Sequence, residues 1–252
     1  MEKYVAINEE GFSIRGKIYA REMSGIGRVI LFGHGFGGHR DNKAAERFAR
    51  RILEKNKGVA VMTFDWPCHG SDARKKLRLE ECDTYLRLVL EFIRSRFSDP
   101  EIYAYATSFG AYLFLKYMAE HGKVFVRTAL RSPAVNMYES ITGDIMTDAD
   151  RSLIGKGKPA KVGFDRKVEI DGEFLESLKQ ADIREIDFLD FADDILIIHG
   201  TKDEIIPLEV VKAFSEQNVI ELVEAEGADH RFQNPLHMDE AIARIAAFFG
   251  MR

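Results

Sequence analysis

Cysteine is scarce in this sequence, with only Cys68 and Cys82 among 252 residues. A fold held together by several disulfides is therefore excluded, and we expect both thiols to be reduced. The chain also lacks any run of about 18 apolar residues, and its start, MEKYVAINEEG, has no basic segment followed by an apolar one. We therefore expect a cytoplasmic protein without a membrane span or a signal peptide.

An excess of basic charge is missing as well, since the net charge is -5 and the isoelectric point is about 5.9. A broad basic face for nucleic acid or an anionic membrane is therefore not expected. There is no HExxH motif, no zinc-type Cys/His spacing and no acidic calcium loop. We expect a small-molecule substrate, no metal and no cofactor, and the sequence leaves open whether the chain forms a homodimer.

What the sequence does contain is an alternation of short apolar runs with helical patterns. The apolar runs cover residues 28–33, 59–64, 102–106, 195–200 and 219–225, and the helical patterns cover residues 44–56, 80–97, 108–121 and 235–249. Such runs are typical of strands buried on both faces. The alternation predicts an α/β fold with a mostly parallel central sheet and helices on both faces. We expect one domain over residues 1–252.

Two segments depart from this alternation. Residues 4–8 and 12–20, joined by a short Glu-Glu-Gly link, predict an antiparallel hairpin at one sheet edge. From about residue 136 to 187 the rhythm lapses, which predicts a compact insertion over the sheet. Between Arg151 and Val168 six basic residues accompany one acid; this favours a solvated surface over a binding site for an anionic substrate or partner.

The motif ATSFG, residues 106–110, lies where an expected strand meets an expected helix. A sharp turn at this junction exposes a serine hydroxyl above the sheet, and small residues two positions before and after the serine let the two backbones approach. Ala106 stands where glycine is usual and adds one methyl group. Ser108 could alternatively be an ordinary helix N-cap, but its position favours a nucleophile.

A serine nucleophile needs a base and an acid that orients the base. Asp203 follows the expected strand at 195–200, and His230 follows the next one, so all three groups should meet at the carboxyl ends of parallel strands. The glycine-rich loop GHGFGG, residues 33–38, can turn the backbone amide of Phe36 inward, and the amide of Phe109 follows the serine. Cys68 is a weaker nucleophile candidate because no strand-to-helix turn surrounds it.

With these motifs in order, the chain resembles the α/β-hydrolase family over nearly its full length. The ordered motifs are HGFGG, DWPCHGSD, ATSFG, HGTKDEIIP and GADH. The resemblance implies Ser108 as nucleophile, Asp203 and His230 as its acid and base, and the amides of Phe36 and Phe109 as oxyanion donors. The insertion, with DGEFLESLKQADI at 171–183, is similar to the compact lid of bacterial feruloyl and cinnamoyl esterases.

The expected function is hydrolysis of carboxylic esters through an acyl-enzyme. Trp66, Phe164 and Phe174, beside the aromatic residues of the oxyanion site, are expected to contact short-to-medium or aryl-acyl substrates. One alternative is an acylaminoacyl peptidase or thioesterase that uses the same triad. Another is a binding protein that has lost catalysis, which the presence of all three triad residues disfavours.

Overall fold

An eight-stranded sheet forms the centre of the protein in a computed structural model that describes all residues from Met1 to Arg252. Its strands are β1 (Glu2–Glu9), β2 (Phe12–Ala20), β3 (Arg28–Gly33), β4 (Val59–Phe64), β5 (Glu101–Thr107), β6 (Thr128–Arg131), β9 (Ile195–Gly200) and β10 (Glu221–Ala225). Their spatial order is β1-β2-β4-β3-β5-β6-β9-β10. The β1–β2 hairpin is antiparallel and lies at one edge, and the other six strands of this sheet are parallel to one another, which confirms the predicted sheet.

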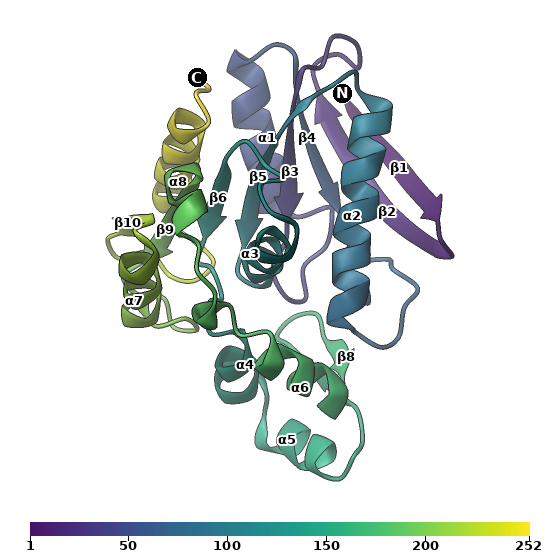
Figure 1. The fold of residues 1–252 in the computed structure, drawn as a ribbon, viewed down its shortest axis with the longest axis vertical. Coiled ribbons are helices and arrows are strands. Elements are labelled where there is room, and N and C mark those ends of the chain that lie inside the picture. The colour runs from purple at the N-terminus through teal and green to yellow at the C-terminus, as the bar shows by residue number, and fades with distance from the viewer.

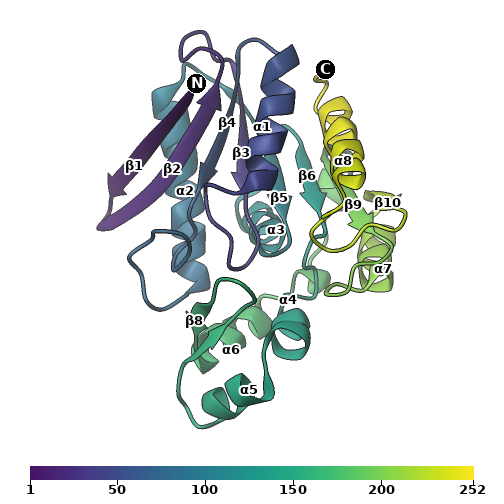
Figure 2. The same cartoon turned by 180° about the vertical axis from the view of Figure 1, so that it is seen from behind.

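Helices cover both faces of the sheet. Helices α2 (Leu79–Arg96), α3 (Phe109–His121) and α7 (Leu208–Asn218) contribute to one core, and α1 (Lys43–Lys55) and α8 (Pro235–Phe248) to the other (Figures 1 and 2). Within β3, Val29 and Leu31 enter the first core, whereas Ile30 and Phe32 enter the second. Successive side chains of a strand point to opposite faces, so a sheet covered on both sides needs the uninterrupted apolar runs seen in the sequence.

One strand and one helix of the main body were not predicted from the sequence. Strand β6 has four residues, TALR, and both of its ends are polar although they are buried. Helix α7 buries Ser215 and Asn218 together with Val211 and Phe214, so its apolar spacing is weak. Both elements owe their burial to neighbouring strands and helices, which local patterning does not record.

The insertion expected at about 136–187 occupies residues 137–194, between β6 and β9. It contains α4 (Met137–Glu139), a π-helical turn (Ser140–Ile145), α5 (Asp148–Gly155), the antiparallel pair β7 (Ala160–Val162) and β8 (Val168–Ile170), α6 (Gly172–Gln180) and two 3-10 turns (Ile183–Glu185, Leu189–Asp194). It lies beyond the carboxyl ends of the parallel strands (Figure 1). None of the protein's helices combines the length and apolar character needed to cross a bilayer.

Specific contacts fasten the insertion to the main body. The guanidinium of Arg78, just before α2, donates to both carboxylate oxygens of Asp171 at 3.0 and 2.8 Å. The same carboxylate caps α6 by accepting from the amide of Phe174 at 3.1 Å. The hydroxyl of Tyr112 on α3 donates to the carbonyl of Ala181 at 3.0 Å. Because these contacts involve α2 and α3, the sheet and its helices fix the position of the insertion.

We predict that Gly200→Ala destabilises the protein, because an added Cβ would lie 2.2 Å from the carbonyl oxygen of Ala228. Overpacking of this kind lowers the free energy of unfolding by about 1–3 kcal/mol. Gly143→Ala is the control: nothing lies within 4 Å of its added Cβ, so stability should be unchanged or up to about 1 kcal/mol higher. Urea unfolding followed by circular dichroism measures both, and equal midpoints for the two variants would contradict the close approach at Gly200.

Candidate active site

Ser108 lies on a strained turn between β5 and α3, with φ 51° and ψ -118°. A positive φ is unfavourable for a residue with a side chain and persists only where surrounding contacts enforce it. Here the amide of Ser108 donates to the carbonyl of Arg131 at 3.2 Å, and its carbonyl accepts from the amides of Tyr112 and Ala134 at 3.1 and 3.3 Å. The turn is therefore held by both α3 and the loop after β6.

The small residues around Ser108 have a steric reason. A Cβ on Gly110 would lie 2.6 Å from the carbonyl oxygens of Gly33 and His34, so α3 approaches β3 too closely for any side chain there. Ala106 is opposite Gly33 in the β3–β5 register, and a Cβ on Gly33 would lie 3.3 Å from the Ala106 methyl. The glycine of the neighbouring strand thus provides the room that the methyl of Ala106 occupies.

The hydroxyl of Ser108 contacts a histidine and does not cap α3. Its Oγ lies 3.1 Å from Nε2 of His230, in the loop after β10, and it makes no capping hydrogen bond to the helix. Nδ1 of His230 lies 2.8 and 3.0 Å from the two carboxylate oxygens of Asp203, in the loop after β9. The structure therefore brings together the three residues that the sequence placed at separate strand ends.

Asp203 is a buried carboxylate with a complete set of donors. Its Oδ1 accepts from the amides of Ile205 and Ile206 at 2.9 and 2.8 Å, besides its contact with His230. Burial by itself raises the pKa of Asp203, but the hydrogen bonds from His230 and the two amides outweigh burial and hold the pKa below its ordinary value. An ionised carboxylate only accepts hydrogen bonds, so Nδ1 of His230 carries the proton and Nε2 can accept from Ser108.

A second histidine lies beside the carboxylate. His199 is fully buried, and its Nε2 lies 3.0 Å from the carbonyl of Ile206 and 3.5 Å from Oδ2 of Asp203. Burial lowers the pKa of His199, so at neutral pH this imidazole is uncharged and does not compete with His230 as a cationic partner. Its role in the structure is to close the loop that carries Asp203.

The loop after β3 passes directly over the serine. A Cβ added to Gly35 would lie 3.3 Å from the Cβ of Ser108. The rings of Phe36 and Phe109 pack edge to face, with centroids 5.7 Å apart. Phe36 lies in the turn closed by the hydrogen bond from the Gly38 amide to the Gly35 carbonyl, and its own amide donates no backbone hydrogen bond. The amide of Phe109, in the first turn of α3, has no intrahelical acceptor. Both amides are thus available to a ligand.

Ser108 and His230 open onto a cavity of about 340 Å³. Its walls come from the loop after β3, the turn after β6, the loop of His230 and the tip of the insertion between β7 and β8. Only 5 of its 18 lining residues are hydrophobic, so the cavity is more polar than its aromatic neighbours suggested. Among the lining residues that the sequence did not indicate are Arg131 and Arg231, because neither belongs to a recognised motif.

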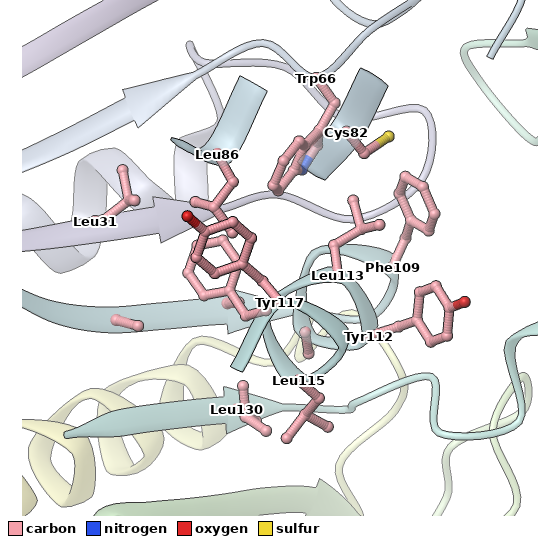
Figure 3. Close-up of a cluster of buried hydrophobic side chains, with 14 of the residues drawn as sticks. Leu31, Trp66, Cys82, Leu86, Phe109, Tyr112, Leu113, Leu115, Tyr117 and Leu130 are labelled. Atoms are coloured by element: carbon pink, nitrogen blue, oxygen red, sulfur yellow. The ribbon is translucent and has the colours of Figure 1, made fainter. Parts of the chain in front are cut away.

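Of the three aromatic residues expected to contact substrate, one lines the cavity and two are buried away from it. Phe164 lines the cavity and is half exposed. Trp66 is completely buried, donates from Nε1 to the carbonyl of His34 at 3.1 Å and lies within the apolar cluster between the sheet and α3 (Figure 3). Phe174, on α6, is completely buried. Neither of these two lines the cavity, and the structure corrects the expectation for both.

Other candidate chemistry is not supported at this site. Burial raises the pKa of the Cys68 thiol to about 12, so it is not a thiolate at neutral pH and is a poor nucleophile. One group of potential metal ligands, Asp83, Glu120 and His121, lies on α2 and α3 outside the cavity. It has no connection with Ser108.

The sheet order and a serine on a strand-to-helix turn, with its aspartate and histidine in the loops after β9 and β10, define the α/β-hydrolase class of fold. A family model described as "Alpha/beta hydrolase family" matches residues 29–248. The chain therefore belongs to the alpha/beta hydrolase family, and this membership supports a hydrolase activity. No curated protein sequence matches the chain.

Solved structures agree on the fold. Est1E from Butyrivibrio proteoclasticus, with ferulic acid bound, has a TM-score of 0.77 at 20% identity and covers 98% of this chain and 99% of its own. The esterase domain of a Rhodothermus marinus protein has a TM-score of 0.72 at 19% identity, covering 98% and 97%. The esterase Pf2001 from Pyrococcus furiosus has a TM-score of 0.70 at 19% identity, covering 99% and 92%.

We predict that His69 makes stability fall with pH below neutrality. This imidazole is buried and stacks on Phe109, and burial lowers its pKa from 6.5 to about 4. Below pH 6.5 the unfolded chain therefore binds a proton at this residue that the folded protein accepts only near pH 4. The free energy of unfolding falls by on the order of 3 kcal/mol as the pH decreases from 6.5 to 4. In His69→Gln this part of the loss should disappear. Urea unfolding at several pH values tests it, and equal slopes for both proteins would contradict it.

Proposed function

We propose that the protein is a serine hydrolase of carboxylic esters that works through an acyl-enzyme. The observation that carries the proposal is the continuous hydrogen-bonded series from Ser108 through His230 to Asp203, with the serine on a strained turn at the wall of a cavity. Family membership and the similarity to solved esterases support the proposal.

The reaction follows from the contacts of these groups. Oγ of Ser108 attacks the ester carbonyl while its proton passes to Nε2 of His230, and Asp203 stabilises the resulting imidazolium. The amides of Phe36 and Phe109 would bind the negatively charged oxygen of the tetrahedral intermediate. His230 then returns the proton to the departing alcohol. In the second half, water attacks the acyl carbon while His230 takes its proton, and His230 returns this proton to Oγ of Ser108 as the acid departs.

The cavity suits a short-to-medium acyl group or a single aromatic ring. Its volume of about 340 Å³ lies at the small end of the range for ligand sites, and Phe36 and Phe164 provide apolar surface on two of its walls. Est1E, one of the similar structures, holds ferulic acid. We therefore propose that short and aryl-acyl esters are preferred over long-chain lipids.

The first test is covalent labelling by a fluorophosphonate, which reacts with an activated serine. Wild-type protein should be labelled once, and Ser108→Ala should not be labelled and should lose about 10⁴- to 10⁶-fold in kcat. Ser95→Ala, which removes a serine from the exposed end of α2, is the matched control and should behave as wild type. Labelling of Ser108→Ala at the wild-type rate would remove Ser108 as the nucleophile, and an unreactive wild type would favour a binding protein.

The second test concerns the orienting acid. We expect Asp203→Asn to lower kcat by roughly 10⁴-fold, because the amide cannot hold the proton on Nδ1 of His230. Thermal unfolding of the variant should be followed in parallel, so that loss of activity is not confused with loss of fold. Activity within tenfold of wild type in a folded variant would assign the orienting role to another group.

A substrate series separates esters from the alternatives on the same triad. Values of kcat/KM for p-nitrophenyl acetate, butyrate and laurate, methyl ferulate, an acyl thioester and an acylaminoacyl amide should be greatest for the short and aryl-acyl esters. A preference for the amide or the thioester would make the protein a peptidase or a thioesterase. A preference for laurate would show that the cavity opens further than its volume indicates.

A further inference from the structure

A buried arginine beside the serine has no acidic partner. Arg131 is the last residue of β6, its carbonyl accepts from the amide of Ser108, and the residue lines the cavity although only 6% of it is exposed. The guanidinium donates one hydrogen bond, to the carbonyl of Arg231 at 2.9 Å, and lies over the ring of Phe232 at 4.9 Å. Its Nε is buried and has no acceptor at all.

This arrangement is unusual within the protein. Arg40 and Arg78, the other arginines with largely covered side chains, pair with Asp65 and Asp171. No carboxylate lies within ion-pair distance of Arg131. A buried charge without a counter-ion is unfavourable, so a negatively charged ligand that pairs with Arg131 would be stabilised by it.

Two more guanidinium groups belong to the same cavity. Arg231 follows His230 and pairs with Asp165 at 3.1 Å, where both side chains are largely exposed. Arg166, from the insertion, makes no ion pair; burial and, after it, the positive charge of Arg166 lower the pKa of His39. Three guanidinium groups thus accompany one carboxylate in a protein whose net charge is -5.

We propose that the ester substrate carries a second, negatively charged group, a carboxylate or a phosphate, which Arg131 binds with help from Arg166 and Arg231. The proposal rests on the ester hydrolysis proposed above and specifies the substrate of that same site. Guanidinium groups bind such anions through paired hydrogen bonds, and Nη2 of Arg131, which donates to no protein acceptor and is not among the buried atoms, supplies an unused donor. In this proposal Arg166, one of the basic residues of the insertion, contacts the substrate and is not only a solvated surface charge.

The test compares matched esters that differ in one charge. For a charge on the acyl side, monomethyl adipate is compared with methyl hexanoate. For a charge on the alcohol side, 4-acetoxybenzoate and 4-acetoxyphenyl phosphate are compared with 4-acetoxybenzamide. We expect wild-type kcat/KM to favour the charged ester at least tenfold in one of these arms, and that arm identifies where the charge is carried.

Substitutions then assign the preference to Arg131. Arg131→Met keeps much of the side-chain volume and should reduce the charged-to-neutral ratio of kcat/KM at least tenfold, mainly through KM, whereas Arg131→Lys should restore part of it. The melting temperature of Arg131→Met should be equal or higher, because an unpaired buried charge is removed. Arg94→Gln, at the far end of α2, removes an exposed charge and should leave the ratio unchanged.

Two outcomes would overturn the proposal. One is a wild type that hydrolyses neutral and charged esters equally, which leaves the esterase function intact. The other is a fall in both rates by the same factor in Arg131→Met, which would mean that Arg131 serves the turn of Ser108 only. Calorimetric binding of monomethyl adipate and methyl hexanoate to Ser108→Ala tests anion recognition without turnover. A wild type that is inactive on every ester would therefore contradict the proposed esterase function but not the anion recognition.

Discussion

The turn at Ser108 is the constraint on which the other features of the site depend. Strand β5 and helix α3 meet so closely that Gly110 lies against the carbonyl oxygens of β3, and Ser108 takes a positive φ. Hydrogen bonds from the loop after β6 and from α3 hold that conformation. The result is a hydroxyl that points away from its helix and toward His230, and a cavity that forms where the parallel strands end.

Two buried charges lie near this turn: protein groups stabilise the first, whereas the second has no counter-ion within the protein. Asp203 is buried with two amides and an imidazole around it, so its negative charge is stabilised within the protein. Arg131, at the end of β6 between β5 and β9, is buried with a carbonyl and an aromatic ring only. The first arrangement suits orientation of a base, and the second suits recognition of an anion brought by a ligand.

The aromatic residues show why a motif does not reveal the lining of a pocket. Trp66 follows a strand end, as site residues often do, yet its indole turns back into the core against Phe64 and Phe114. Phe174, on α6, is completely buried in the larger apolar cluster. Only 5 of the 18 residues on the cavity wall are hydrophobic, so the site is more polar than the predicted aromatic contacts suggested.

The sequence by itself determined the mainly parallel sheet, the edge hairpin, the place of the insertion and the order of Ser108, Asp203 and His230, because apolar runs and strand-end motifs are local patterns. It did not reveal β6, whose four residues are half polar, or α7, whose buried face includes a serine and an asparagine. Only the tertiary structure decided that Arg131 meets the loop of Arg231, 100 residues away, and that Trp66 is hidden. Burial and convergence of side chains depend on packing between distant segments, and no local pattern encodes that packing.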